Sequence, residues 1–234
     1  MIRLRTGPAA LFGALFFAAL LAFLPMRLAL GWLGAGEQGL TARAASGSVW
    51  AGRLTDARFG DLALGDLDAA LSPVALLVGQ ARISLNRGDA LHGAVGISRH
   101  GRRIDDLTAS LTTGRVFAPL PVSRLDLADV TIRFADDRCE AAAGRVTATL
   151  AGDAAGIALP TSVSGNARCE GTALLLPLAS QAGTETITLR ITGTGSYTAT
   201  LALAASDPVM AARLAAAGFI AGPGGYRLSV EGSF

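Results

Sequence analysis

The sequence predicts a single-pass N-terminal transmembrane helix followed by a mainly antiparallel all-β domain with one short helix near the C-terminus. Three observations predict this fold class. The run from Thr6 to Met26 contains no ionisable residue. From Thr41 onward, apolar residues recur at every second position, as in strands with one buried face. A convincing helical segment follows only at residues 207–218. The pattern leaves open whether the strands form one curved sheet or a sandwich.

The apolar run is long enough for a membrane-spanning helix. About 20 helical residues cross the ~30 Å hydrocarbon core of a bilayer, so we expect an anchor over residues 6–30. Arg3 and Arg5 lie in the short tail that precedes it, residues 1–5, and no acidic residue offsets them. Because positively charged flanks stay inside, we expect this tail in the cytoplasm and the bulk of the chain in the periplasm.

A cleaved signal peptide is the alternative, because a charged start and an apolar run are also its signature. Ala42-Arg43-Ala44 fits the small-x-small cleavage rule, but it lies well beyond the run. The run is also longer than the roughly 7–15 residues of a typical signal peptide. We therefore favour a retained anchor in the inner membrane, while its later cleavage stays open. Arg27 and Trp32 follow the run and suit the far interface as a snorkelling side chain and an aromatic anchor.

The composition is typical of one exported domain and excludes a nucleic-acid binder. A glycine-rich linker is expected over residues 31–45 and a periplasmic β-rich domain over 46–234. The domain's roughly 190 residues are enough for one sizeable core. All twenty basic residues are arginine, the net charge is +2, and the arginines alternate with eighteen acidic residues. Without a basic block, the chain offers no electrostatic footprint for nucleic acid.

The strands are predicted by alternation and by turn residues every ten or so positions. In residues 81–86, for example, Ile83 and Leu85 share one face and polar residues share the other. This predicts a meander of hairpins with one apolar and one polar face. The same alternation recurs at residues 91–98, 107–111, 130–134, 146–150, 186–191, 197–203 and 226–234.

One helix near the C-terminus has clear start and stop signals. Asp207 precedes Pro208, which places a capping residue before proline at the first helical position. Helix-forming residues continue to Ala217, and Gly218 can adopt the left-handed conformation that ends a helix. These signals predict a single short helix in the soluble domain.

The two cysteines, Cys139 and Cys169, are predicted to form a disulfide. In an oxidising compartment, two cysteines in one domain are most simply bonded to each other. Closing a loop of about thirty residues should contribute roughly 3–4 kcal/mol to stability. Neither His92 nor His100 has ligand-like spacing to a cysteine, so no metal site is expected.

The search for catalytic motifs predicts that the chain is not an enzyme and needs no cofactor. Gly222-Pro223-Gly224-Gly225 follows a helix and precedes a strand, the reverse of a phosphate-binding loop. Asp105-Asp106 and Asp136-Asp137 are adjacent pairs, whose side chains diverge to opposite faces of a strand. They are typical of turns rather than of an acid/base couple. Neither G-x-S-x-G nor H-E-x-x-H occurs.

Several segments, taken in order, resemble a known family. Gly47-Ser48-Val49-Trp50-Ala51-Gly52 is similar to a G-T/S-V-W-x-G element, and Leu71-Ser72-Pro73 followed by Leu76-Leu77-x-Gly79 is similar to an L-x-P…L-L-x-G segment. The cysteine pair and the ending from Asp207-Pro208 to Gly232 match as well. Together they resemble type II secretion system protein N. The resemblance implies an inner-membrane accessory component of the apparatus that exports folded proteins across the outer membrane.

The resemblance also implies the partners, namely inner-membrane platform or periplasmic components of that apparatus. The family has no defined reaction, so it assigns no catalytic residue. Two roles stay open for Trp50 of the Gly47–Gly52 motif. Its side chain can pack into the hydrophobic core next to the linker, or it can stay exposed and bind a partner. A different class of function also stays open. An uncovered apolar sheet face would form a lipid-binding groove, as in envelope proteins of the AsmA type, with lipid as the partner.

Overall fold

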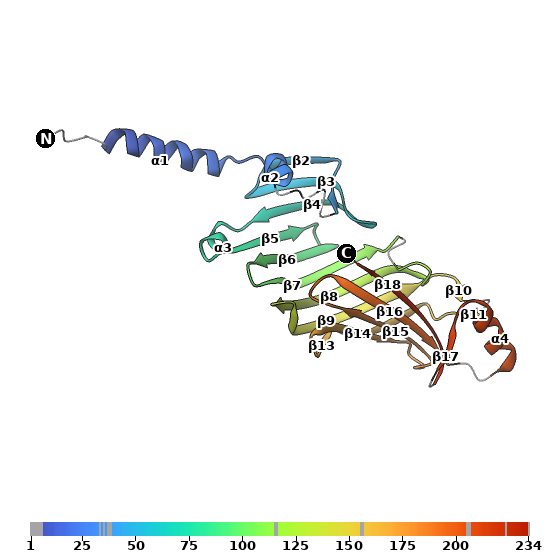
Figure 1. The fold of residues 1–234 in the computed structure, drawn as a ribbon. Coiled ribbons are helices and arrows are strands. Elements are labelled where there is room, and N and C mark those ends of the chain that lie inside the picture. Colours follow the sequence, from blue (N-terminus) through green and yellow to red (C-terminus); the bar gives the residue numbers. More distant parts are fainter. Residues whose placement is uncertain are drawn as a thin grey trace.

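The computed structural model describes residues 7–32, 34, 36, 39–114, 117–154, 157–204, 207–222 and 224–233. Figure 1 shows a helix projecting from one end of a long, strongly curved sheet. The cytoplasmic tail predicted over residues 1–5, with Arg3 and Arg5, lies outside the described residues.

The apolar N-terminal segment forms two helices rather than one. The first, α1 (Gly7–Ala22), ends before Pro25, and α2 (Met26–Trp32) begins after it. Proline has no N–H for the helical ladder and forces the preceding residue, Leu24, out of helical conformation. Pro25 instead forms an isolated bridge with Ser48. The described residues therefore do not support one membrane-spanning helix in the segment 6–30, and Pro25 is the physical reason for the break.

Within the described ranges, the structure contains no helix that combines the length and the apolar character needed to cross a bilayer.

The β domain is one large sheet in which neighbours along the chain are mostly neighbours in space, as predicted for a meander. Its hydrogen-bonded order is β1-β3-β4-β5-β6-β7-β8-β9-β12-β14-β15-β16-β18-β17, with β2 paired to β3 and β13 paired to β14. The strand pairs of this sheet are antiparallel, which confirms the predicted fold class of the domain. The strands are β1 (Leu40–Thr41), β2 (Ala44–Ser48), β3 (Ala51–Phe59), β4 (Leu62–Leu71), β5 (Gln80–Asn86), β6 (Leu91–Ser98), β7 (Gly101–Thr112), β8 (Val122–Ala135), β9 (Arg138–Leu150), β12 (Ser162–Asn166), β13 (Arg168–Glu170), β14 (Ala173–Ala179), β15 (Glu185–Ile191), β16 (Ser196–Leu203), β17 (Ile220–Gly222) and β18 (Gly225–Ser233). A separate two-stranded ribbon consists of β10 (Asp153–Ala154) and β11 (Ile157–Ala158).

The sheet begins inside the segment 31–45 that was expected to be a linker. Strand β1 lies within that segment, and strand β2 begins in it at Ala44.

The two faces of the sheet differ as the alternation predicts. Ile83, Val95, Ile104 and Ile132 lie opposite one another across four successive strands. One position away, Arg103 lies opposite Arg133 on the other face. Because side chains alternate between faces along a strand, this register gives the sheet one apolar and one polar side.

The apolar side is buried because the sheet rolls onto itself. In Figure 1 the C-terminal strands β16 and β18 lie against the long central strands β8 and β9. Phe117, just before β8, packs edge-on against Tyr197 of β16, with ring centroids 5.8 Å apart. At Gly193 a Cβ would lie 2.4 Å from the Cα of Asp137, so the β15–β16 turn touches the β8–β9 turn. The domain is thus one rolled sheet rather than two separate layers.

A single core fills this roll. It consists of inward-facing aliphatic residues from β8 to β18, closed at one end by α4 (Pro208–Ala216), whose Leu214 is fully buried. Asp207 caps α4 by accepting a hydrogen bond from the N–H of Val209 at 3.0 Å, and Gly218 has a φ of +89°. Both features confirm the predicted helix. A further short helix, α3 (Pro73–Leu77), joins β4 to β5 and was not expected.

The predicted disulfide is present. Cys139 of β9 and Cys169 of β13 are bonded, with their Cα atoms 5.5 Å apart and thirty positions between them in sequence. The N–H of Cys139 also donates to the carbonyl of Thr172 at 2.9 Å. The bridge therefore fastens the short strand β13 to the central strand β9.

Replacing both cysteines by alanine should lower the free energy of unfolding by roughly 3–4 kcal/mol, because the unfolded chain then regains the freedom of an open loop. For a domain of this size the melting temperature should fall by roughly 6–16 °C. Thermal unfolding of the full chain, followed by circular dichroism, measures this. Reductant should produce the same fall in the unmodified chain and none in the double variant. An unchanged melting temperature in both comparisons would contradict a structural bridge.

Candidate functional site: the sheet edge beside the first helix

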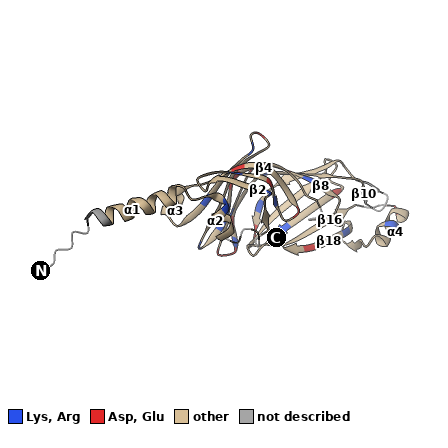
Figure 2. Cartoon of the chain, turned by 90° about the horizontal axis from the view of Figure 1, so that it is seen from above, with Lys and Arg blue, Asp and Glu red and all other residues tan. Residues whose placement is uncertain are grey.

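One edge of the sheet collects the segments that resemble the family motifs. Because the meander reverses at every turn, the β2–β3 turn, α3 and the β6–β7 turn all fall on the edge from which α1 leaves (Figure 1). Figure 2, turned by 90°, again shows α3 beside the base of α1. We call this surface the α1-proximal edge and define it as residues 47–52, 72–80 and 97–103.

The β2–β3 turn is hydrogen-bonded to the end of α1. The N–H of Val49 donates to the carbonyl of Leu24 at 3.0 Å, and the indole N–H of Trp50 donates to the carbonyl of Leu21 at 2.8 Å. The carbonyl of Leu21, near the end of α1, also accepts from the N–H of Leu24 at 3.3 Å, so the indole is its second donor. Val49 is buried, whereas Trp50 is half-buried. The sheet is thus joined to α1 by direct contacts as well as by the chain.

Two glycines allow this close approach. Gly47 has a φ of +81°, a conformation that side chains disfavour. A Cβ on Gly52 would lie on the sulfur of Met26, the buried first residue of α2. Met26 packs with Leu54 and Leu67 on the apolar face of the first strands. The glycines of the Gly47–Gly52 segment therefore let α2 cover that face.

The residues predicted to flank a membrane lie on α2. Arg27 is exposed, and Trp32 at the end of α2 is 76% exposed and makes no hydrogen bond to the described residues. α2 contacts β2 and the apolar face of the first strands, so both residues are held beside the sheet. Their role at a membrane interface stays a prediction.

The second motif builds a short protrusion. Ser72 caps α3 by accepting a hydrogen bond from the N–H of Ala75 at 3.3 Å, and its own N–H donates to the carbonyl of Arg82 at 2.8 Å. Pro73 takes the first turn, where its missing N–H costs nothing. Gly79 has a φ of +73° and returns the chain to β5. The alternation in the sequence did not indicate this protrusion, although Ser72-Pro73 carries the same capping signal as Asp207-Pro208.

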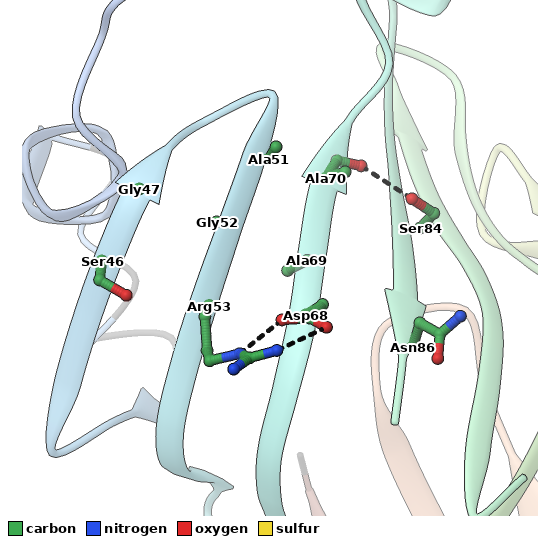
Figure 3. A pocket seen from close by; sticks show the side chains of 10 residues that line it. All are labelled: Ser46, Gly47, Ala51, Gly52, Arg53, Asp68, Ala69, Ala70, Ser84 and Asn86. Carbon is green, nitrogen blue, oxygen red and sulfur yellow. Dashed lines mark hydrogen bonds and ion pairs between the residues drawn. The ribbon is translucent and has the colours of Figure 1, made fainter. Parts of the chain in front are cut away.

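A depression of about 500 Å³ lies nearby on the polar face (Figure 3). Its principal polar contact is an ion pair in which Arg53 donates twice to Asp68, with Nε–Oδ1 at 2.7 Å and Nη2–Oδ2 at 3.1 Å. The hydrogen bond from Arg53 lowers the pKa of Asp68 below its ordinary value, and Asp68 in turn raises the pKa of Arg53. Both side chains are exposed, so solvent screens the pair.

The depression offers no arrangement for acid/base chemistry. Asp68 is its single carboxylate and is already paired with Arg53; the remaining lining is small or neutral. Across the described residues, histidine, cysteine, aspartate and glutamate form no group of three that could hold a metal. Nδ1 of His100, on the β6–β7 turn, lies 3.6 Å from Oδ1 of Asp136 on the exposed β8–β9 turn. His92 is exposed on strand β6. The geometry directs attention to the α1-proximal edge as a contact surface.

Replacing Trp50 by phenylalanine should loosen the junction with α1, because the carbonyl of Leu21 loses its indole donor. A neutral hydrogen bond contributes about 1 kcal/mol, so amides in residues 21–32 should exchange about fivefold faster. Hydrogen-exchange mass spectrometry of the full chain in detergent measures this. Trp32→Phe is the matched control, and its exchange should not change. Equal exchange in both variants would contradict the proposed role of the indole contact.

The comparisons with known proteins agree with the motifs. The family model for type II secretion system protein N matches residues 38–229, nearly the whole β domain. A type II secretion system protein N of Vibrio cholerae is 32% identical over 147 residues, which cover 57% of this chain and 58% of that relative. The chain thus spans a little over half the length of that relative. No solved structure matches. By the extent of the family match, the chain belongs to the family of type II secretion system protein N.

Proposed function

We propose that this protein is an accessory component of the type II secretion apparatus. The observation that carries the proposal is the family match over residues 38–229, which includes both segments of the α1-proximal edge that resemble family motifs. The Vibrio cholerae relative bears the name of that system, although the alignment covers only 58% of its length. The proposed partners are the inner-membrane platform or periplasmic components of the apparatus.

The proposed location is the inner membrane, with the N-terminus in the cytoplasm and the sheet in the periplasm. α1 consists of sixteen residues without a charge, and its large side chains, Leu11, Phe12, Phe16 and Phe17 among them, are exposed. A helix that exposes apolar side chains on all sides needs an apolar environment. The disulfide between Cys139 and Cys169 suits an oxidising compartment. Both observations support an exported domain held by its N-terminal segment.

The proposed role is non-enzymatic. The described side chains supply surfaces on a folded sheet, whereas catalysis requires a nucleophile, a base or a metal at a site that accepts substrate. A scaffold of this kind positions other subunits through its exposed edge. No second function is proposed, because the apolar face that would line a lipid groove is occupied between β8 and β18 by the sheet's own packing.

Alkaline phosphatase fused after Phe234 should be active in cells, because the enzyme folds only where disulfides form. A β-galactosidase fusion at the same point should be inactive. Colony colour and enzyme assays measure both. The opposite pair of results would place the β domain in the cytoplasm and overturn the proposed topology.

Deleting the gene should reduce export of the substrates of the type II apparatus, and crosslinking in whole cells should recover platform or periplasmic components with the tagged full chain. Secreted enzyme activity and mass spectrometry of the crosslinked products measure the two effects. A chain without residues 72–79, rejoined by glycines and checked for its disulfide, tests whether α3 contributes. Normal secretion after deletion of the gene, together with no subunit crosslinked to the full chain, would contradict the proposed function.

A further inference from the structure

The helix α3 exposes an apolar tip that nothing in the described chain covers. Val74 is 70% exposed, Leu77 is 86% exposed and Val78 is 70% exposed. The segment from Pro73 to Ala81 contains no ionisable residue. Single exposed apolar residues are common on soluble proteins, but a contiguous group at the end of a protrusion marks a contact site.

The position of this tip restricts what it can contact. The tip lies on the α1-proximal edge, separated from the β2–β3 turn only by the width of strands β3 and β4, roughly 10 Å at about 4.8 Å per strand. That turn is hydrogen-bonded to the last turn of α1. Figure 1 shows α3 at the same end of the strands as the base of α1, with the first strands of the sheet between them, and Figure 2 shows the two helices close together in a view turned by 90°. A surface that receives α1 therefore comes within reach of α3.

Further along the same edge, the β6–β7 turn is apolar and basic. Ile97 is 57% exposed, and the neighbouring side chains of Arg99 and Arg102 are exposed and have no ion pair with the described residues. A depression of about 330 Å³ lies here, lined by Ile97, Arg102 and Arg103 among others. Isoleucine beside unpaired arginines combines an apolar contact with sites for phosphate oxygens.

The acidic groups of this edge are mostly engaged or lie farther from α1. Asp105 pairs with Arg82 at 3.2 Å and with Arg103 at 3.5 Å. Asp136 belongs to the β8–β9 turn, one hairpin farther from α1, and its Oδ1 lies 3.6 Å from Nδ1 of His100 on the β6–β7 turn. The part of the edge between α1 and the β6–β7 turn thus carries unpaired positive charge and apolar side chains.

We propose that this edge is a second membrane contact, in which the tip of α3 and Ile97 enter the headgroup region of the bilayer while Arg99 and Arg102 bind anionic lipid phosphates. The inference rests on the proposed placement of the N-terminal segment in the inner membrane. Apolar residues flanked by arginines are the composition of interfacial membrane-binding surfaces. The hydrogen bonds between α1 and the β2–β3 turn hold the edge close to the lipid surface, so the contact orients the sheet relative to the membrane.

The test uses photoreactive benzoylphenylalanine, placed in the full chain at one position at a time. Leu77 reports on the tip, Phe16 on α1, and the exposed Val209 of α4, at the far end of the roll, is the matched control. Each protein is reconstituted in vesicles of phosphatidylethanolamine and phosphatidylglycerol and irradiated. Mass spectrometry should find lipid adducts at positions 16 and 77 and none at 209.

Removing the charges separates the two parts of the contact. In an Arg99→Gln/Arg102→Gln chain, the lipid adduct at position 77 should fall up to about thirtyfold in these vesicles, because each arginine near an anionic surface contributes about 1 kcal/mol. It should change little in vesicles of phosphatidylcholine alone, where no anionic lipid is present. An adduct at position 77 that is unaffected in both vesicle types would show that the arginines bind no lipid and would overturn that part of the proposal.

The probes at positions 16 and 77 distinguish the membrane placement of α1 from the second membrane contact at α3. Adducts at position 16 without any at position 77 would overturn the second contact and leave the membrane placement intact. Absence of adducts at both positions would overturn the membrane placement itself. Irradiation of cells that carry the same proteins tests a protein occupant. Crosslinks from position 77 to a protein, with no lipid adduct, would replace the membrane by a docking partner.

Discussion

The structure depends on one constraint, which is that a sheet with one apolar face must bury that face with little help from helices. The described chain contains only short helices next to the sheet, and a flat sheet of this length would leave its aliphatic face in water. The roll removes that face from water by bringing β16 and β18 onto the central strands, where Phe117 meets Tyr197. At the start of the sheet, which the roll does not reach, α2 places Met26 on the same apolar side. The roll and the packing of α2 thus both bury the apolar face, at different parts of the same sheet.

The roll also determines what remains available on the surface. Because the apolar side is used for packing, the outer side carries the ion pairs and hydroxyl groups, and most of these are exposed and screened. Apolar side chains still reach solvent at a few places, among them Val209 of α4 and Ile220 of β17. On the edge beside α1 they do so at α3 and at Ile97. The same topology that completes the core therefore brings α3 and Ile97 to the edge beside α1.

Local features of the fold could be predicted from the sequence, whereas long-range ones could not. Alternation predicts strands and their faces because the period of two is a property of each strand alone, and Asp207-Pro208 predicts α4 because capping is local. The disulfide follows from compartment and cysteine count. The roll depends on contacts between residues eighty positions apart, such as Phe117 and Tyr197, and no local pattern encodes them. Both helix signals that were missed are visible in the sequence: Pro25 ends α1, and Ser72-Pro73 begins α3.

The candidate site follows the same division. The motif from Gly47 to Gly52 can be recognised in the sequence, but its physical role cannot, since the partner of Trp50 is a carbonyl of Leu21 that the sequence places twenty-nine residues earlier. The contact becomes intelligible once Pro25 is seen to turn the chain back toward the β2–β3 turn through its bridge with Ser48. The proline break and the glycine-rich turn are then parts of one junction. It fixes the direction in which the sheet leaves α1, and this direction decides which edge of the domain lies on the side of the helix.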